Sequence, residues 1–191
     1  LWPYHSHTHE WRDINAGLLG GIIVTRRGAA RDDGSPADVD REFVVLFASF
    51  NEMESRYTAQ NLRTYTGDTL RAGPRGDYDF SAGGLESING YLFGNLPLET
   101  INIAVGDRVR WYTFAGTTGN DFHAVHWHGG TVLTGRQRMD VVNLAVPLFA
   151  VTSDMVADVP GVWMLHCHVA EHTQGGMTAR FRIREKGLAA N

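Results

Sequence analysis

The nine histidines of this chain fall into three short clusters, and none stands apart as an ordinary surface or core residue. A single histidine is more often a structural residue than a ligand, but imidazole is also the commonest metal-binding side chain. Three clusters therefore predict metal binding by a fold that brings separate segments together. A structural role stays open for His9. The clusters are His5, His7 and His9, then His123, His126 and His128, and finally His166, His168 and His172.

The spacing within the clusters predicts on which face of a strand each side chain lies. Residues two apart in a strand share a face, and adjacent residues point to opposite faces. His166 and His168 are therefore expected on one face and Cys167 on the other. His123 has the opposite parity to the two histidines that follow it in its cluster, which places it with Cys167. One strand can thus serve two metal sites.

A set of four residues is expected on the Cys167 side, two of them from the loop after the strand. Two imidazoles, a thiolate and a nearby thioether are the ligands of a blue electron-transfer copper site. Zinc also accepts two histidines and a thiolate, but structural zinc sites prefer a fourth strong ligand. Copper is therefore the predicted ion, and core packing is the alternative for the methionine. The set is His123, Cys167, His172 and Met177.

Six histidines are expected on the other side, which is more imidazole than one tetrahedral ion needs. They predict a cluster of metal ions, and imidazole suits copper well. They are His126, His128, His166 and His168, joined by the same-face pair His5 and His7.

Strand signals dominate the chain. Residues 42–50, 101–114, 161–166 and 178–183 are rich in β-branched and aromatic residues and are separated by Gly, Asn and Asp turns. Residues 53–65 favour a helical turn or two only weakly. The sequence therefore predicts a mainly β fold.

Composition excludes several classes of protein. Apolar residues make up 43% of the 191 residues and charged residues 20%, and no apolar run is long enough to span a bilayer. The net charge of −4 and the mixed charges provide no basic stripe for nucleic acid. The single cysteine excludes an internal disulfide, so the composition gives no clue to whether the protein works in an oxidising compartment.

A polar segment, residues 26–40, separates two stretches with related patterns and is interpreted as a linker. YHSHTHEW followed by GLLGGIIV precedes it, and LHCHVAEH followed by GGMTARFRI stands near the other end of the chain, so one short unit occurs twice. We therefore expect the end of a first domain in residues 1–25, a complete second domain in residues 41–186, and a tail in residues 187–191.

Two motifs resemble the C-terminal signature of multicopper oxidases: HAVHWHG, which starts at His123, and HCHVAEHTQGGM, which starts at His166. Other segments, such as INGYLFGNLP, are similar to the ceruloplasmin and hephaestin branch and to its small two-domain bacterial relatives. The resemblance covers nearly the whole chain. It implies an all-β, cupredoxin-like Greek-key β-sandwich, preceded by the C-terminal end of another cupredoxin domain.

The resemblance also implies a role for each ligand. A type 1 copper would be held by His123, Cys167 and His172, with Met177 as axial ligand. Electrons would enter there, at Cys167 and His172, and pass to a trinuclear copper centre where dioxygen becomes water. In that centre the type 2 ion would be bound by His126, and the type 3 pair by His5, His7, His128, His166 and His168.

Two departures from the family pattern matter. Ser6 stands where Cys167 stands in the second unit, and no histidine follows at the matching spacing, so the first domain is expected to lack a type 1 copper. The family's His-x-His-Gly motif, which supplies two further ligands, does not occur before residue 26. We therefore expect a missing N-terminal portion, either a separate chain or absent. The two-domain relatives further imply a homotrimer, and the family a secreted or periplasmic location.

The sequence determines the reductant least of all. A laccase-like oxidation of phenols or aromatic amines demands few residues around His172 and is preferred. A ferroxidase is the alternative, because Glu171 precedes His172 and Glu86 stands at an iron-site position of the family, where the family has histidine. Ser81 occupies a further position where an acid is expected. Both glutamates are equally well explained as solvated surface carboxylates.

Proteins from other classes share parts of this pattern. A copper nitrite reductase has the type 1 ligands but a His-Cys-Ala sequence at the strand, so His168 argues against it. An electron-transfer cupredoxin needs only the first ligand set. The partners expected for an oxidase are dioxygen and a small reducing substrate.

Overall fold

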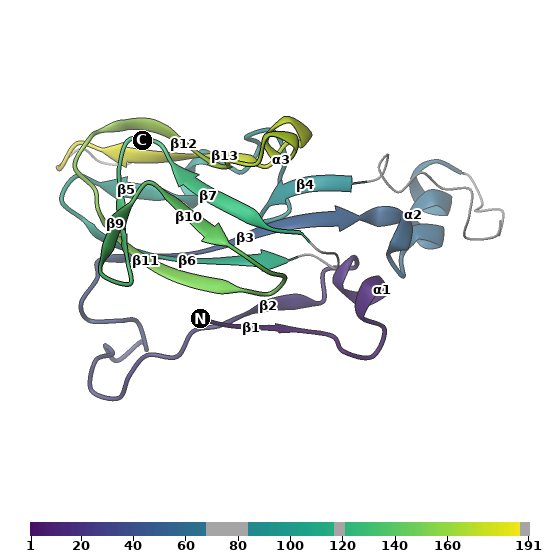
Figure 1. Ribbon diagram of the computed structural model, residues 1–191, viewed down its shortest axis with the longest axis horizontal. Coiled ribbons are helices and arrows are strands. Elements are labelled where there is room, and N and C mark those ends of the chain that lie inside the picture. Colours follow the sequence, from purple (N-terminus) through teal and green to yellow (C-terminus); the bar gives the residue numbers. More distant parts are fainter. Residues whose placement is uncertain (68–83, 117–120, 188–191) are drawn as a thin grey trace.

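The computed structural model describes residues 1–67, 84–116 and 121–187, and shows two β-sheets packed face to face (Figure 1). Ser81 and the tail beyond residue 187 lie outside the described residues. The larger sheet has six strands, in the order β4 (Gly84–Ile88), β3 (Arg41–Asn51), β6 (Arg108–Gly116), β11 (Ala150–Val156), β8 (Val132–Thr134) and β9 (Gln137–Met139).

The second sheet has five strands and carries the cysteine. Its order is β10 (Val141–Leu144), β7 (His123–Trp127), β12 (Gly161–Cys167), β13 (Thr178–Arg184) and β5 (Asn102–Ala104). β12 therefore lies between β7 and β13 and is hydrogen-bonded along both edges. The mainly β prediction is confirmed.

Alternation along the strands builds the core between the sheets. On β13, Ala179, Phe181 and Ile183 are buried, while the arginines between them point outward. Phe181 packs edge-on against Trp111 at 5.7 Å between ring centroids, and Trp111 meets Trp127 of the facing sheet at 5.9 Å. These aromatic contacts join the layers behind the histidine strands.

Two local predictions need correction. Residues 101–114 form two strands rather than one, because Gly106, at φ +89°, and Asp107 make a turn between β5 and β6. Residues 53–65, which favour helix only weakly in the sequence, contain a full α-helix. The short helices are α1 (Glu10–Ile14), α2 (Thr58–Tyr65), α3 (Ala170–Gly175) and the 3₁₀ turns η1 (Glu52–Glu54) and η3 (Leu98–Thr100). Among the described residues, no helix is long and apolar enough to cross a membrane.

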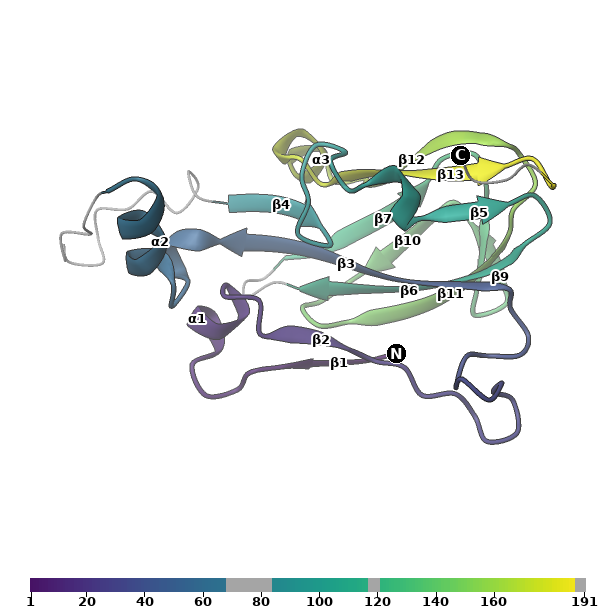
Figure 2. The same cartoon turned by 180° about the vertical axis from the view of Figure 1, so that it is seen from behind.

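The repeated sequence unit forms two hairpins with the same register. β1 (Trp2–His5) pairs with β2 (Leu19–Ile22) so that His5 faces Leu19, and His166 of β12 faces Thr178 of β13 in the same manner. Figures 1 and 2 both show the β1–β2 hairpin outside the sandwich, on the side of β6 and β11. The sequence repeat is thus a structural repeat.

The two hairpins differ in what covers them. Leu165 and Phe181 of the second hairpin are fully buried, whereas their counterparts in the first, Tyr4 and Ile22, are 53% and 54% exposed. The first hairpin therefore presents one apolar face without a covering sheet in the part of the chain that the structure describes.

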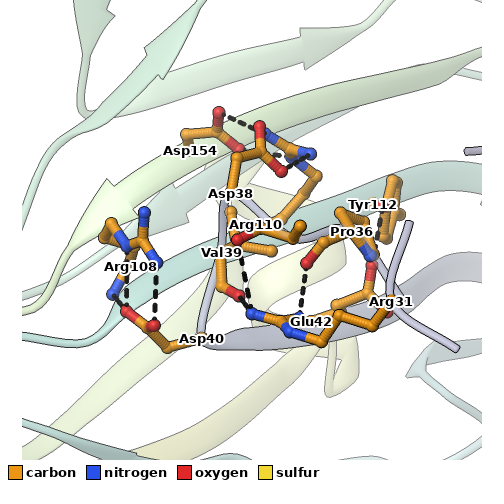
Figure 3. Close-up of polar contacts among 11 residues, drawn as sticks. Arg31, Pro36, Asp38, Val39, Asp40, Glu42, Arg108, Arg110, Tyr112 and Asp154 are labelled. Atoms are coloured by element: carbon orange, nitrogen blue, oxygen red, sulfur yellow. Dashed lines mark hydrogen bonds and ion pairs between the residues drawn. The ribbon is translucent and has the colours of Figure 1, made fainter. Parts of the chain in front are cut away.

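The C-terminal end of residues 26–40 is fixed to the sandwich by arginines (Figure 3). Arg110 of β6 contacts Asp38 at 3.0 Å and Asp154 of β11 at 2.7 Å. Arg108 pairs with Asp40 at 3.0 Å and, with a backbone N–H bond, lowers the pKa of that carboxyl to about 2. Arg31 donates to backbone carbonyls within the segment. This segment is therefore a connector whose last residues are bonded to β6 and whose middle part is bonded internally through Arg31.

Removing the central cation of this network should weaken the attachment. We expect Arg110→Gln to lower the free energy of unfolding by about 1 kcal/mol at low ionic strength, because Arg110 is mostly buried and serves two carboxylates. Urea denaturation measures the loss, which should shrink in high salt. Arg27→Gln, an exposed position in the same segment, is the matched control. Equal losses in both variants would contradict the network's role.

Candidate metal centres

The register between β7 and β12 sorts the ligands. His126 faces His166, and Val125 faces Cys167. Paired residues in an antiparallel ladder point to the same side of the sheet. His126 and His166 thus share one face, and Cys167 shares the other with Val125 and, two residues earlier, His123. The predicted sorting is confirmed.

On the Cys167 face, three donor atoms converge. His123 Nδ1 and His172 Nδ1 lie 3.2 Å apart, and Cys167 Sγ lies 3.5 Å from His172 Nδ1 and 4.0 Å from His123 Nδ1. Their ligand atoms all fall within 4.8 Å of one another. This is a compact trigonal donor set at the end of β12.

The loop after β12 returns the remaining residues to this place. α3 ends at Gly175, and the cap residue Gly176, whose φ of +115° suits glycine, turns the chain back. The N–H of Met177 donates to His172 O at 2.9 Å, and Met177 O accepts from the N–H of Cys167 at 3.1 Å. Met177 is fully buried. Its backbone is therefore tied to two of the proposed ligands.

Burial tunes both kinds of ligand in the metal-free protein. Burial lowers the pKa of His123 to about 4, so its imidazole is neutral and holds a free lone pair at neutral pH. Burial also raises the pKa of the Cys167 thiol, against N–H groups including that of Ala124, 3.4 Å from Sγ. A cation that replaces the thiol proton would relieve this penalty.

On the opposite face, four imidazoles form a second group. His128 Nε2 and His166 Nε2 lie 3.2 Å apart, and His126 meets both rings at centroid distances of 4.7 and 5.0 Å. His168 lies 5.2 Å from His126. Burial and the neighbouring histidines lower the pKa of His126. The group is open to solvent at the exposed His168.

His5 and His7 do not join this group within one chain. Their rings are 5.6 Å apart, and His5 Nδ1 lies 3.3 Å from Glu10. No ring contact links either to the four imidazoles among the described residues. The sequence predicted six histidines together, but the structure brings together four and two. His9 is exposed before α1.

A hydrogen bond links the two faces. His166 Nδ1 lies 2.6 Å from the carbonyl oxygen of Cys167, which fixes the proton on Nδ1 and leaves Nε2 free toward His128. Thr173 of α3 donates to the same carbonyl. Thr173 was missed in the sequence because a helical hydroxyl has no ligand signature.

A carboxylate pair lies at the edge of His172. Asp121 Oδ1 is 3.3 Å from His172 Nε2, and Ser49 Oγ lies 2.9 Å from Asp121 Oδ2 and 2.7 Å from Glu86 Oε2. Burial, more than any other cause, raises the pKa of Glu86. Glu171 is exposed in the first turn of α3. Sequence reasoning missed Asp121, although it stands two residues before His123.

A family model described as multicopper oxidase matches residues 58–187. The chain belongs to the multicopper oxidase family. Copper is the cofactor of this family, and both donor sets fit it: imidazole suits copper, and two imidazoles with a thiolate beside a buried methionine make a poor zinc site.

Curated relatives extend the match to almost the whole chain. The ferroxidase HEPHL1 of Homo sapiens is 34% identical over 95% of this chain, and human hephaestin is 34% identical over 98%. Human ceruloplasmin is 34% identical over 95%. The chain spans only 16 to 17% of the length of these relatives.

Solved structures confirm the cupredoxin-like sandwich. A blue copper oxidase from Nitrosomonas europaea aligns with a TM-score of 0.64 at 18% identity, covering 95% of this chain and 55% of that one. A copper nitrite reductase from the same organism gives 0.65 at 20% identity, with 95% and 61% covered. At such identities the likeness concerns the fold alone.

The histidine environment predicts that the stability of the metal-free protein depends on pH. In the unfolded chain His123 is protonated near pH 6.5, whereas in the folded protein its pKa is about 4. The free energy of unfolding therefore falls as the pH drops through this window. The free energy of unfolding should fall by about 1 to 3 kcal/mol between these limits, with His126 and His166 acting in the same direction. Urea denaturation of the apoprotein measures it. In His123→Gln the pH slope should be shallower, and an unchanged slope would contradict the assignment.

Proposed function

We propose that this chain forms part of an oxidase that takes single electrons at a type 1 copper and delivers them to dioxygen at a trinuclear copper centre, with water as product. The type 1 ligands would be His123, Cys167 and His172, with the thioether of Met177 as a further ligand. In the trinuclear centre the type 2 ligand would be His126, and the type 3 ligands His5, His7, His128, His166 and His168. The observation that carries the proposal is the β7–β12 register, which places His123 and Cys167 on one face of the strand pair and His126 and His166 on the other.

The chain's own residues provide a short connection between the two centres. Bound copper would supply the change of oxidation state at each centre. Cys167 and its neighbours in sequence join the centres covalently, and the bond between His166 Nδ1 and Cys167 O adds a second path of 2.6 Å. The buried aromatic core excludes water behind the strands. A single-centre electron carrier would give the four imidazoles on the other face no role.

We propose Fe(II) as the reductant, which replaces the laccase-like preference drawn from the sequence. Two observations support this. The relatives that span nearly the whole chain include a protein named as a ferroxidase, and a carboxylate pair lies beside His172. Oxygen ligands of this hard type favour Fe(III) over Fe(II), so binding at Glu86 and Asp121 would assist electron loss. Glu171 would add a third carboxylate at the exposed edge.

We further propose that the β1–β2 hairpin is the end of a first cupredoxin domain, with residues 26–40 as linker and residues 41–186 as the second domain. Its outer face matches the buried face of the second hairpin, so a further sheet of that domain would cover it. His5 and His7 would then meet the four imidazoles of another subunit, as in a homotrimer. The two missing trinuclear ligands would come from the same first domain, in a secreted or periplasmic protein.

The assignment of the sulfur ligand can be tested directly. Cys167→Ser should abolish the visible blue band and oxygen uptake, because a hydroxyl does not replace the thiolate as a copper ligand. Copper analysis should show the loss of one ion per chain while the remaining copper stays. His9→Gln serves as the control histidine. A blue band or oxygen uptake that survives in Cys167→Ser would refute the proposal, as would a wild-type protein with a single copper per chain.

The reductant is tested by comparing Fe(II) with a phenolic substrate in steady state. Glu86→Gln should lower kcat/KM for Fe(II) by about tenfold, a loss of about 1.4 kcal/mol, and leave the phenol rate within about twofold. Glu185→Gln, an exposed acid beyond β13, is the control. A wild-type preference for the phenol, or equal losses for both substrates, would favour the laccase-like reaction.

A further inference from the structure

The loop that carries His5 and His7 has the backbone of a type 1 copper loop. The N–H of Ser6 donates to Leu18 O at 3.0 Å, as that of Cys167 donates to Met177 O at 3.1 Å. The N–H of Leu18 donates to Asp13 O at 2.9 Å, as that of Met177 donates to His172 O at 2.9 Å. The same two bonds therefore close both loops.

This correspondence pairs the side chains as well. Ser6 stands in the place of Cys167, Asp13 in that of His172, and Leu18 in that of Met177. Gly17, at φ +86°, precedes Leu18 as Gly176 precedes Met177. Counting residues from the His-x-His motif does not align Asp13 with His172, because the first loop is two residues longer than the second.

A polar pair replaces the two copper ligands in the first loop. Ser6 Oγ donates to Asp13 Oδ2 at 2.5 Å, where the second loop has Cys167 Sγ beside His172 Nδ1. This bond is the largest cause that lowers the pKa of Asp13, so the carboxylate is ionised. A charged donor set of this kind has no sulfur or imidazole to hold a blue copper.

A segment that follows β3 supplies the counter-ion. Arg56, which follows η1, lies 2.7 Å from Asp13 Oδ1, and its N–H donates to Arg12 O at 3.3 Å. The side chain of Asp13 is only 5% exposed. A buried carboxylate is costly unless it is paired, so Arg56 makes the Ser6–Asp13 bond tenable.

We propose that Ser6, Asp13 and Arg56 form a metal-free lock that replaces a type 1 copper and positions His5 and His7 for metal binding. Ser6 lies between the two histidines, whose rings are 5.6 Å apart, and its hydroxyl is turned to Asp13, so anchoring that hydroxyl fixes the backbone that carries both imidazoles. The positioning role rests on the proposed function, in which His5 and His7 are copper ligands. Arg56 belongs to the proposed second domain, so its contact with Asp13 links the position of His5 and His7 to the domain that contains Cys167.

Two readouts on the intact protein test the lock. In the apoprotein, Asp13→Ala should raise hydrogen exchange at the Ser6 and Leu18 amides by about tenfold and leave the Cys167 and Met177 amides unchanged. Ser6→Ala, which removes one hydrogen bond only, should act in the same direction if Asp13→Ala folds poorly. Asp33→Ala, in the exposed part of the connector, is the control.

In the copper-loaded protein, both variants should keep the blue type 1 band and lose at least about half of the remaining copper. Unchanged exchange at Ser6 and Leu18 would overturn the lock. Faster exchange with full copper content would overturn its positioning role. If the wild type binds only type 1 copper, the proposed function fails and the positioning role with it, whereas the exchange measurement still decides whether the lock exists.

Discussion

The pairing of β12 with β7 is the constraint on which the proposed metal centres depend. A strand alternates its side chains, so the register with its neighbour decides which residues share a face. β12 is hydrogen-bonded on both edges, to β7 and to β13. A shift of its register by one residue would move Cys167 to the face of His126 and would move His166 to the other face. Cys167 and His166 are adjacent in sequence but belong to different donor sets, because adjacent residues of a strand in this register lie on opposite faces of the sheet.

Strand periodicity accounts for most of the structure that the sequence predicted. The mainly β fold and the sorting of His123 with Cys167 depend on a period of two, which local sequence displays. The contacts among the four imidazoles on the opposite face follow from the same two-residue period. The carboxylate beside His172 was not predicted, because Asp121 reaches it from a loop and meets Glu86 through Ser49, a contact between segments far apart in sequence. Periodicity also cannot tell whether two histidine pairs meet within one chain, and His5 and His7 remain apart from the others.

The two hairpins show how one backbone can serve two chemistries. Their registers and loop-closing hydrogen bonds are the same, yet one loop gathers sulfur and imidazole and the other a hydroxyl, a carboxylate and a guanidinium. The covering also differs, since the apolar side chains of the second hairpin lie in the core and those of the first are exposed. Geometry that is set by the backbone thus persists where the ligands have changed.

The arginine-bound connector also has a geometric consequence. Salt bridges from β6 hold Asp38 and Asp40, at the end of residues 26–40, against the sheet, so the direction in which this segment joins the sandwich is set within a single chain. When identical copies meet through unlike surfaces, the rotation between neighbours determines whether they close into a ring or continue as a filament. In this chain a few guanidinium–carboxylate pairs would set that angle.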